Sequence, residues 1–200
     1  VTCVRTFGNR VYRAYVSRSV SIGYELTGRA ASSATVTISQ DGYGNTTRKA
    51  TTFTGGHTKT ETATFYNNSS SWLIGRPRSM VVASRRNGMP TLAKTTQYAY
   101  DSSYVRLIRE VQEPNGGSSR RMENRYSYDA FGNQTVMTKV AHNGAALESR
   151  TDRKVFDATG RFELTTSNAL GHTVKRTFDP RTGNVLSLTD ANGIRSVSTY

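Results

Sequence analysis

The sequence contains a single cysteine, Cys3, and therefore cannot form a disulfide within the chain. It has only three histidines, His57, His142 and His172, and they are widely separated. Zinc and iron sites are built from clustered cysteine, histidine and carboxylate side chains. No uninterrupted apolar run approaches the roughly 18 residues that a membrane-spanning helix needs. We therefore expect no metal site and no membrane span.

Acidic residues are also few. There are 27 lysines and arginines against 14 aspartates and glutamates, which gives a net charge of +13. A basic surface favours anionic partners, nucleic acid included, through the release of counterions. Most basic residues are spread singly, however, with Arg85-Arg86 and Arg120-Arg121 the only arginine pairs. The aromatic residues fall at turn positions instead of forming a common platform. We expect a solvated sheet face and no nucleic-acid partner.

Helical periodicity is missing as well, because no stripe of apolar residues at spacings of three and four persists. Short segments instead alternate between apolar and polar residues and are bounded by Asn-Gly and Asp-containing turns, which indicates β-hairpins. The sequence predicts an all-β fold of antiparallel hairpin repeats in one continuous curved sheet. Six residues of the second half are expected to seal neighbouring strands: Phe162, Leu164, Val174, Phe178, Leu186 and Leu188.

One short phrase recurs in the second half, namely an aromatic residue, an aspartate, two variable residues and a glycine. The copies are Tyr128-Asp129 with Gly132, Phe156-Asp157 with Gly160, Phe178-Asp179 with Gly183 after one extra residue, and Tyr100-Asp101 without the glycine. Successive aspartates are 28, 28 and 22 residues apart. Such regular spacing predicts units that must stack on their neighbours to bury apolar surface.

The phrase has the chemistry of a turn between strands. Aspartate bonds the backbone amide two residues on, and glycine adopts the positive φ that other residues reach at a cost of about 1 to 2 kcal/mol. The aromatic residue then ends the incoming strand. A degenerate copy of the phrase lies at Asp41 and Gly44, which are three residues apart, as Asp129 and Gly132 are. Gly42 and Gly44 lack the third glycine and the helix of a dinucleotide-binding loop, so we expect no cofactor.

The first half leads into this array without a break in composition. We expect a β-rich region over residues 1–97 and the repeat array over residues 98–200, both parts of a larger protein.

Trp72 and Leu73 form the most apolar cluster of the first half. An exposed tryptophan can bind a sugar or a partner, but a tryptophan beside leucine and isoleucine is more often buried. We therefore predict that Trp72 and Leu73 act as a core plug, with both side chains buried in the core.

The array from Tyr98 to Tyr200 resembles the RHS/YD-repeat proteins, which include bacterial polymorphic toxins and the B and C components of insecticidal toxin complexes. The segment around Trp72 and Leu73 extends the resemblance to residues 20–200. The resemblance implies a hollow shell, built from a spiralling β-sheet, that encloses a toxic carboxy-terminal polypeptide. It also implies a secreted or delivered bacterial protein, whose partners are the remainder of the shell, the enclosed toxin and a component of the delivery machine.

The sequence does not predict an enzyme. A protein domain usually has one active site, whereas these aspartates occur in every repeat, which argues against a catalytic role. Many family members cleave themselves near an Asp-Pro-x-Gly motif, but Asp179-Pro180 has one extra residue before its glycine and replaces an ordinary repeat turn. A non-enzymatic shell segment is therefore the leading interpretation. The alternative is a cell-surface β-repeat module for adhesion or carbohydrate binding, and an enzyme ranks third.

Overall fold

The computed structural model describes residues 2–7, 11–103, 105–116, 120–143 and 146–200. Within these ranges the chain contains strands and turns and no helix. Contacts divide it into two compact units, residues 1–98 and 99–200. In each unit the strands pair in antiparallel fashion and in the order in which they follow one another in the sequence. The predicted all-β fold of antiparallel hairpins is confirmed.

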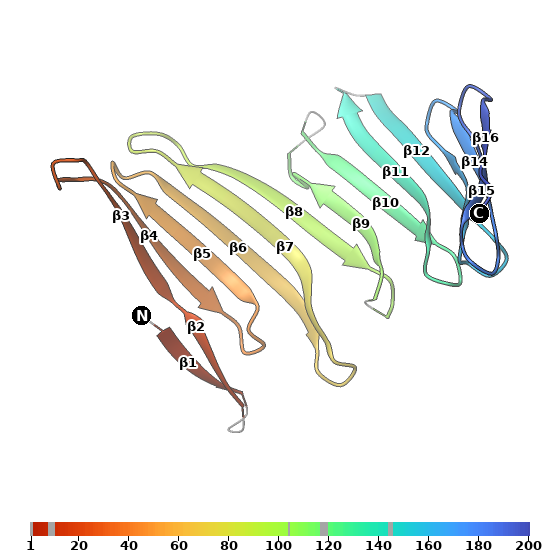
Figure 1. Ribbon diagram of the computed structural model, residues 1–200. Helices are drawn as coiled ribbons and strands as arrows, with labels where there is room; N and C mark the ends of the chain where they lie inside the picture. The colour runs from red at the N-terminus through yellow and green to blue at the C-terminus, as the bar shows by residue number, and fades with distance from the viewer. Residues whose placement is uncertain (1, 8–10, 104, 117–119, 144–145) are drawn as a thin grey trace. The chain divides into compact units, whose positions relative to one another are not determined.

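The first unit begins with a separate hairpin and continues into a sheet (Figure 1). The hairpin consists of β1 (Thr2–Phe7) and β2 (Val11–Val16). The sheet consists of β3 (Arg18–Tyr24), β4 (Ala30–Gln40), β5 (Thr46–Phe53), β6 (Thr58–Asn68), β7 (Leu73–Arg85) and β8 (Leu92–Tyr100), which runs past the end of the unit. Threonine, valine and isoleucine recur in these strands, which is typical of a pleated and half-exposed surface.

The second unit is a meander of shorter strands. Its strands are β9 (Leu107–Gln112), β10 (Met122–Tyr128), β11 (Gln134–Asn143), β12 (Ala146–Phe156), β13 (Glu163–Ser167), β14 (Thr173–Phe178), β15 (Val185–Thr189) and β16 (Arg195–Val197). The sequence of residues 104–111 favours a strand over a short helix, and β9 covers residues 107–111 of that segment, while Tyr104 lies outside the described residues. The aromatic residues of the phrase end their strands as predicted: Tyr100, Tyr128, Phe156 and Phe178.

Each complete copy of the phrase is followed by a β-bulge that the sequence pattern did not reveal. The partner of Ser127 is Val136 and that of Tyr128 is Gln134, so Thr135 is an extra residue on the outgoing strand. Corresponding extra residues are Thr47, Leu164 and Leu186. A bulge bends its strand and increases the local twist. The repeated unit is therefore an aspartate turn followed by a bulge.

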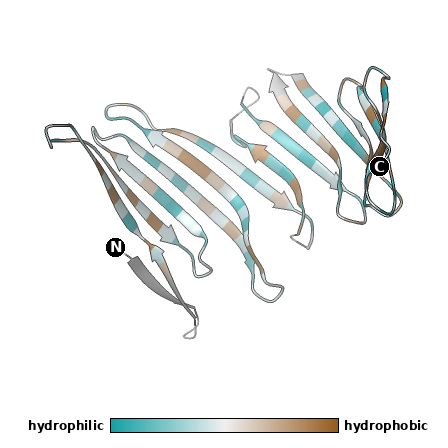
Figure 2. Cartoon of the chain, viewed as in Figure 1, coloured by the Kyte–Doolittle hydropathy of each residue, from teal (hydrophilic) through white to brown (hydrophobic). Residues whose placement is uncertain are grey.

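Few side chains are fully buried. Among the described residues, Val111 is the one buried hydrophobic residue, at 5% exposure, and Glu123 and Ser187 are the buried polar residues. Apolar and polar residues are mixed along the strands of both units (Figure 2). The other strand residues are half-buried or exposed because, within each unit, the described residues form sheet without a helix to cover it.

Two predictions about burial are wrong. Trp72 is 75% exposed, because it ends the turn between β6 and β7 with a φ of 54° and does not plug a core. Leu73, the first residue of β7, is half-buried. Leu186 is 38% exposed, and the neighbouring Ser187 is buried instead. The remaining five sealing residues are half-buried.

Candidate functional site: a row of linked turns

The turn after β10 shows how the phrase works. Oδ1 of Asp129 accepts hydrogen bonds from the amides of Phe131 and Asn133, both at 2.9 Å. The Asp129 amide donates to the Asn133 carbonyl, and the Gly132 amide donates to the Asp129 carbonyl. Gly132 has a φ of 93°, which L residues rarely adopt. One carboxylate and one glycine thus close the turn.

The same geometry recurs along the chain. Asp41 accepts from the amides two and four residues on, as do Asp190 and Asn168 in turns outside the predicted set. Asp157 accepts from the amides four and five residues on, and Asp179 from the amide two residues on. The glycines predicted at turns all have positive φ: Gly44, Gly132, Gly160 and Gly183. Asp101 forms its turn without glycine, through the amide of Val105.

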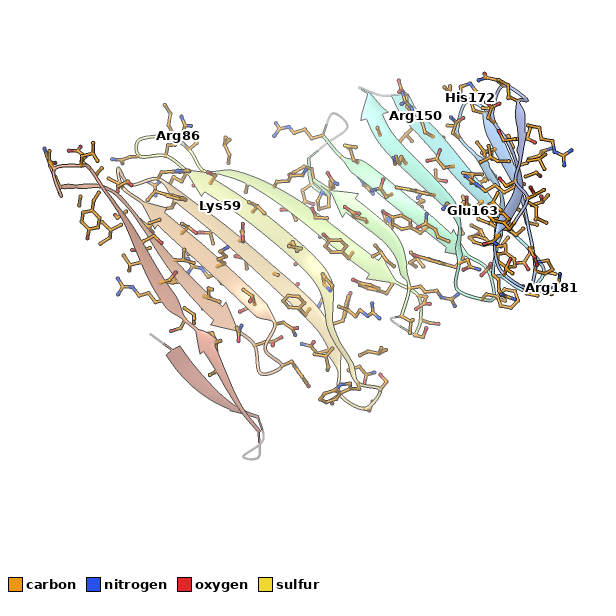
Figure 3. All side chains as sticks on the ribbon, viewed as in Figure 1. Lys59, Arg86, Arg150, Glu163, His172 and Arg181 are labelled. Atoms are coloured by element: carbon orange, nitrogen blue, oxygen red, sulfur yellow. The ribbon has the colours of Figure 1, made fainter. Side chains whose placement is uncertain are left out.

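Alternate turns of a meander lie at the same end of the sheet, because each connection reverses the chain. In the second unit four turns therefore share one end: residues 101–106, 129–133, 157–162 and 179–184 (Figure 1). We call them the turn row. The opposite end carries the turns at 168–172 and 190–194. His172 and Arg181, both labelled in Figure 3, lie at opposite ends of β14: His172 precedes the strand and Arg181 of the turn row follows it.

Hydrogen bonds join each turn of the row to the next. The donor is each time the side chain four or five residues after the aspartate, and the acceptor is a backbone carbonyl of the following turn. The bonds are Arg106 Nη1 to Asp129 O at 3.2 Å, Asn133 Nδ2 to Gly160 O at 2.7 Å, and Arg161 Nη1 to Pro180 O at 3.4 Å. The turns therefore form a linked series instead of four independent loops.

Aromatic packing follows the same series. Phe131, in the turn after β10, lies directly against Gly160 of the next turn. The rings of Phe162 and Phe178 stack with centroids 4.9 Å apart and 14° between their planes. Stacked pairs contribute about 0.5 to 1.5 kcal/mol beyond the burial of their area. Packing and hydrogen bonding thus connect successive repeats at the same end of the sheet.

A related cluster stabilises the turn at Asp41 in the first unit. Asn67 of β6 donates to Oδ2 of Asp41 at 3.0 Å and accepts from Asn45 and from the amide of Gly75. A side chain at Gly75 would lie 2.7 Å from Oδ1 of Asn45. The repeated phrase gives no indication of this role for Asn67. The recurring Gly-Asn pair, at 44–45, 132–133 and 183–184, was the available signal for the asparagines that follow the glycine.

Hydrogen bonding keeps two of the turn aspartates, Asp101 and Asp157, ionised. The hydroxyl of Thr159 and the amides of Phe162 and Arg161 lower the pKa of Asp157 to about 2. For Asp101, desolvation acts to raise the pKa, but bonds from the amide of Val105 and the side chain of Arg106 lower it to about 2. Both carboxylates thus serve as permanent acceptors at neutral pH, and neither has the raised pKa that suits a general acid.

The most buried charge of the second unit lies in the strands. Glu123 of β10 accepts hydrogen bonds from three guanidinium groups: Arg109 at 2.8 and 2.9 Å, Arg121 at 3.0 Å and Arg125 at 2.6 Å. The pKa of Glu123 falls to about 2, and Arg109 contributes most to lowering it, whereas burial acts to raise it. Nε of Arg121 is buried and has no partner in the described structure. Sequence reasoning treated these charges as scattered and missed the cluster.

A second carboxylate cluster lies on β13. Glu163 accepts hydrogen bonds from Lys154 at 2.6 Å, from Arg176 at 2.9 Å and from the hydroxyl of Thr166 (Figure 3). Lys154 and Arg176 belong to the neighbouring strands β12 and β14. The bond from Lys154 is the main cause of the lowered pKa of Glu163. This cluster ties three successive strands together on one face.

The described residues contain no group of three His, Cys, Asp or Glu residues that could hold a metal ion. They also contain no helix with the length and apolarity that a membrane crossing requires. Nε2 of His57 lies 3.0 Å from Oγ of Ser84 in an open hollow of about 510 Å³, whose lining includes Arg86 but no carboxylate to orient the imidazole. His172 contacts Asn168 in a turn, and the side chain of His142 lies outside the described residues.

Replacing Asp190 tests whether the turn aspartate acts as an acceptor or as a charge. Its Oδ1 accepts from the amides of Asn192 and Ile194, as Oδ1 of Asn168 does in its own turn. Asp190→Asn should therefore change the free energy of unfolding by less than about 0.5 kcal/mol, whereas Asp190→Ala should cost about 1 kcal/mol. Urea denaturation followed by circular dichroism measures both. Equal losses for the two variants would show that the charge is what matters.

No protein-family model matches the chain, and no curated protein matches it.

Proposed function

We propose that the chain is a non-enzymatic wall segment of an RHS/YD-repeat shell, which encloses a toxic carboxy-terminal polypeptide until delivery. The observation that supports this most is the turn row, in which one turn chemistry recurs and each copy bonds to the next. A wall must extend by adding equivalent units and seal each to its neighbour. The turn row contains the repeated turn and also the hydrogen bonds that connect each turn to the next.

The electrostatics of the turns agree with a structural role. The aspartates of the phrase accept backbone hydrogen bonds in their own turns, so their carboxylates are occupied in closing the chain reversal. Catalytic carboxylates need room for a substrate and a pKa suited to proton transfer. The recurrence of the same arrangement favours a wall over an active site.

Exposed strands favour pairing with the remainder of the same wall. All seven residues of β3 are exposed, and Val20 and Ile22 retain 48% and 47% exposure. An exposed apolar strand at the edge of a sheet pairs readily with a further strand. In the proposed shell, neighbouring wall segments cover such edges and the enclosed polypeptide contacts the inner face.

Limited proteolysis of the complete protein tests the proposal. A shell should protect a carboxy-terminal fragment from a nonspecific protease under native conditions and release it to cleavage once urea unfolds the wall. A carboxy-terminal region digested at the same rate with and without urea would contradict enclosure.

A further inference from the structure

The two faces of the sheet in residues 99–200 differ in charge. Residues paired across strands share a face, as do alternate residues along a strand. The strand register therefore places five cations on one face, which we call the Arg face: Arg109, Arg125, Arg153, Lys175 and Arg195. Among the described strand residues of this face, Glu123 is the one acid. The Arg face thus has a net charge of +4, five cations against one carboxylate.

The opposite face of the same strands is balanced. Its cations are Lys139, Arg150, Lys154 and Arg176. Its acids are Glu110, Glu148, Asp152 and Glu163. Four cations against four carboxylates leave no net charge. The basic character of the sheet in this unit is therefore concentrated on the Arg face. The sequence did not reveal this asymmetry, because the second half contains 14 basic and 11 acidic residues and only the strand register assigns them to faces.

Three cations of the Arg face are free to bind a ligand. Arg109 and Arg125 are committed to Glu123. Arg153, Lys175 and Arg195 are exposed and make no ion pair within the described part of the chain. Lys175 and Arg195 both pair with Thr189, so they lie two strand spacings, or about 10 Å, apart. This spacing suits a ligand that carries several negative groups.

The remaining side chains of the Arg face favour polypeptide over nucleic acid. Between the cations lie the valines of the face: Val111, Val136, Val140, Val155 and Val197. The aromatic residues of β10, β12 and β14 all lie on the opposite face: Tyr126, Tyr128, Phe156 and Phe178. Proteins that bind single-stranded nucleic acid combine cations with aromatic stacking surfaces. A face of cations and valines instead complements carboxylates that alternate with small apolar side chains.

We propose that the Arg face binds an acidic polypeptide segment in which carboxylates alternate with small apolar or hydroxyl side chains. The ligand's carboxylates pair with Arg153, Lys175 and Arg195. Its apolar side chains contact the valines of the face that remain accessible, namely the exposed Val155 and Val197 and the half-buried Val136 and Val140. Binding of this kind does not require a shell, because the face belongs to the sheet of one unit.

The test uses the full chain and a fluorescently labelled synthetic peptide of alternating glutamate and valine. The variant Arg153→Gln/Lys175→Gln removes two unpaired cations from the Arg face. The matched control Lys139→Gln/Arg150→Gln removes one lysine and one arginine, both exposed, from the opposite face. Fluorescence anisotropy should show binding to the native chain that weakens about fivefold or more in the first variant and less than about twofold in the control. Circular dichroism checks that both variants are folded.

Three results would overturn the proposal. The first is an absence of saturable peptide binding by the native chain. The second is equal weakening by the two variants, which would show that only total charge matters. The third is displacement of the peptide by a single-stranded oligonucleotide at lower concentration than by unlabelled peptide, which would identify the face as a nucleic-acid surface.

Discussion

Replacing Glu123 with alanine is expected to destabilise the chain by about 3 kcal/mol, because three guanidinium groups would lose the one carboxylate that holds them together. Glu123 is only 5% exposed, but the three arginine side chains retain 44%, 35% and 62% exposure, so water solvates the freed guanidinium groups in part and the loss stays at the lower end for a buried ion pair. Urea denaturation followed by circular dichroism measures the loss. Glu61→Ala is the control, because Glu61 pairs with Lys59 at 2.6 Å on an exposed surface and its removal should cost less than about 1 kcal/mol.

The contribution of Glu123 should also depend on pH with a defined sign. Its pKa falls from the ordinary value of 4.5 to about 2 in the folded chain, so the folded state favours the ionised form. The stabilisation is complete above pH 4.5 and is lost as the pH falls towards 2. The difference in stability between the native chain and Glu123→Gln should therefore shrink over this range. A difference that is constant from pH 6 to about pH 2 would contradict the ion cluster.

Replacing Gly160 with alanine is expected to cost about 2 to 3 kcal/mol, the second large effect. Gly160 has a φ of 68°, and the strain of a side chain there accounts for about 1 to 2 kcal/mol. The added methyl group would also collide with the ring of Phe131 from the preceding turn. Gly193→Ala is the matched control, because Gly193 has a φ of 83° but open space around it. The excess loss at Gly160 measures the contact between repeats.

A double-mutant cycle with Phe131→Ala isolates that contact. If the phenyl ring causes the excess loss, Gly160→Ala should cost no more than Gly193→Ala once the ring is removed. Additive losses would instead mean that the two turns do not pack against each other, and the turn row would lose its aromatic link.

The positions of the turns could be predicted because they follow local rules. An aspartate that bonds amides further along and a glycine with positive φ act within five or six residues, so Asp129 with Gly132 and Asp157 with Gly160 are recognisable without tertiary information. The ends of the strands followed for the same reason. The bulges were missed, since the residue that loses its partner is set by the pairing of two strands and not by the phrase.

The charge clusters could not be predicted because they depend on register. Arg109 meets Glu123 only because β9 pairs with β10, and the two residues are 14 positions apart in the sequence. The same holds for Asn67, which reaches Asp41 from another hairpin. Trp72 was predicted to be buried from its apolar neighbours, but its position in a turn, with positive φ, determines its exposure.

We propose that linked repeats of this chain form part of a shell wall. Electron microscopy of the complete protein in negative stain tests this proposal. We expect a hollow particle whose wall is one sheet thick. A solid rod without an internal cavity would contradict the shell and favour an adhesion module built from the same turns.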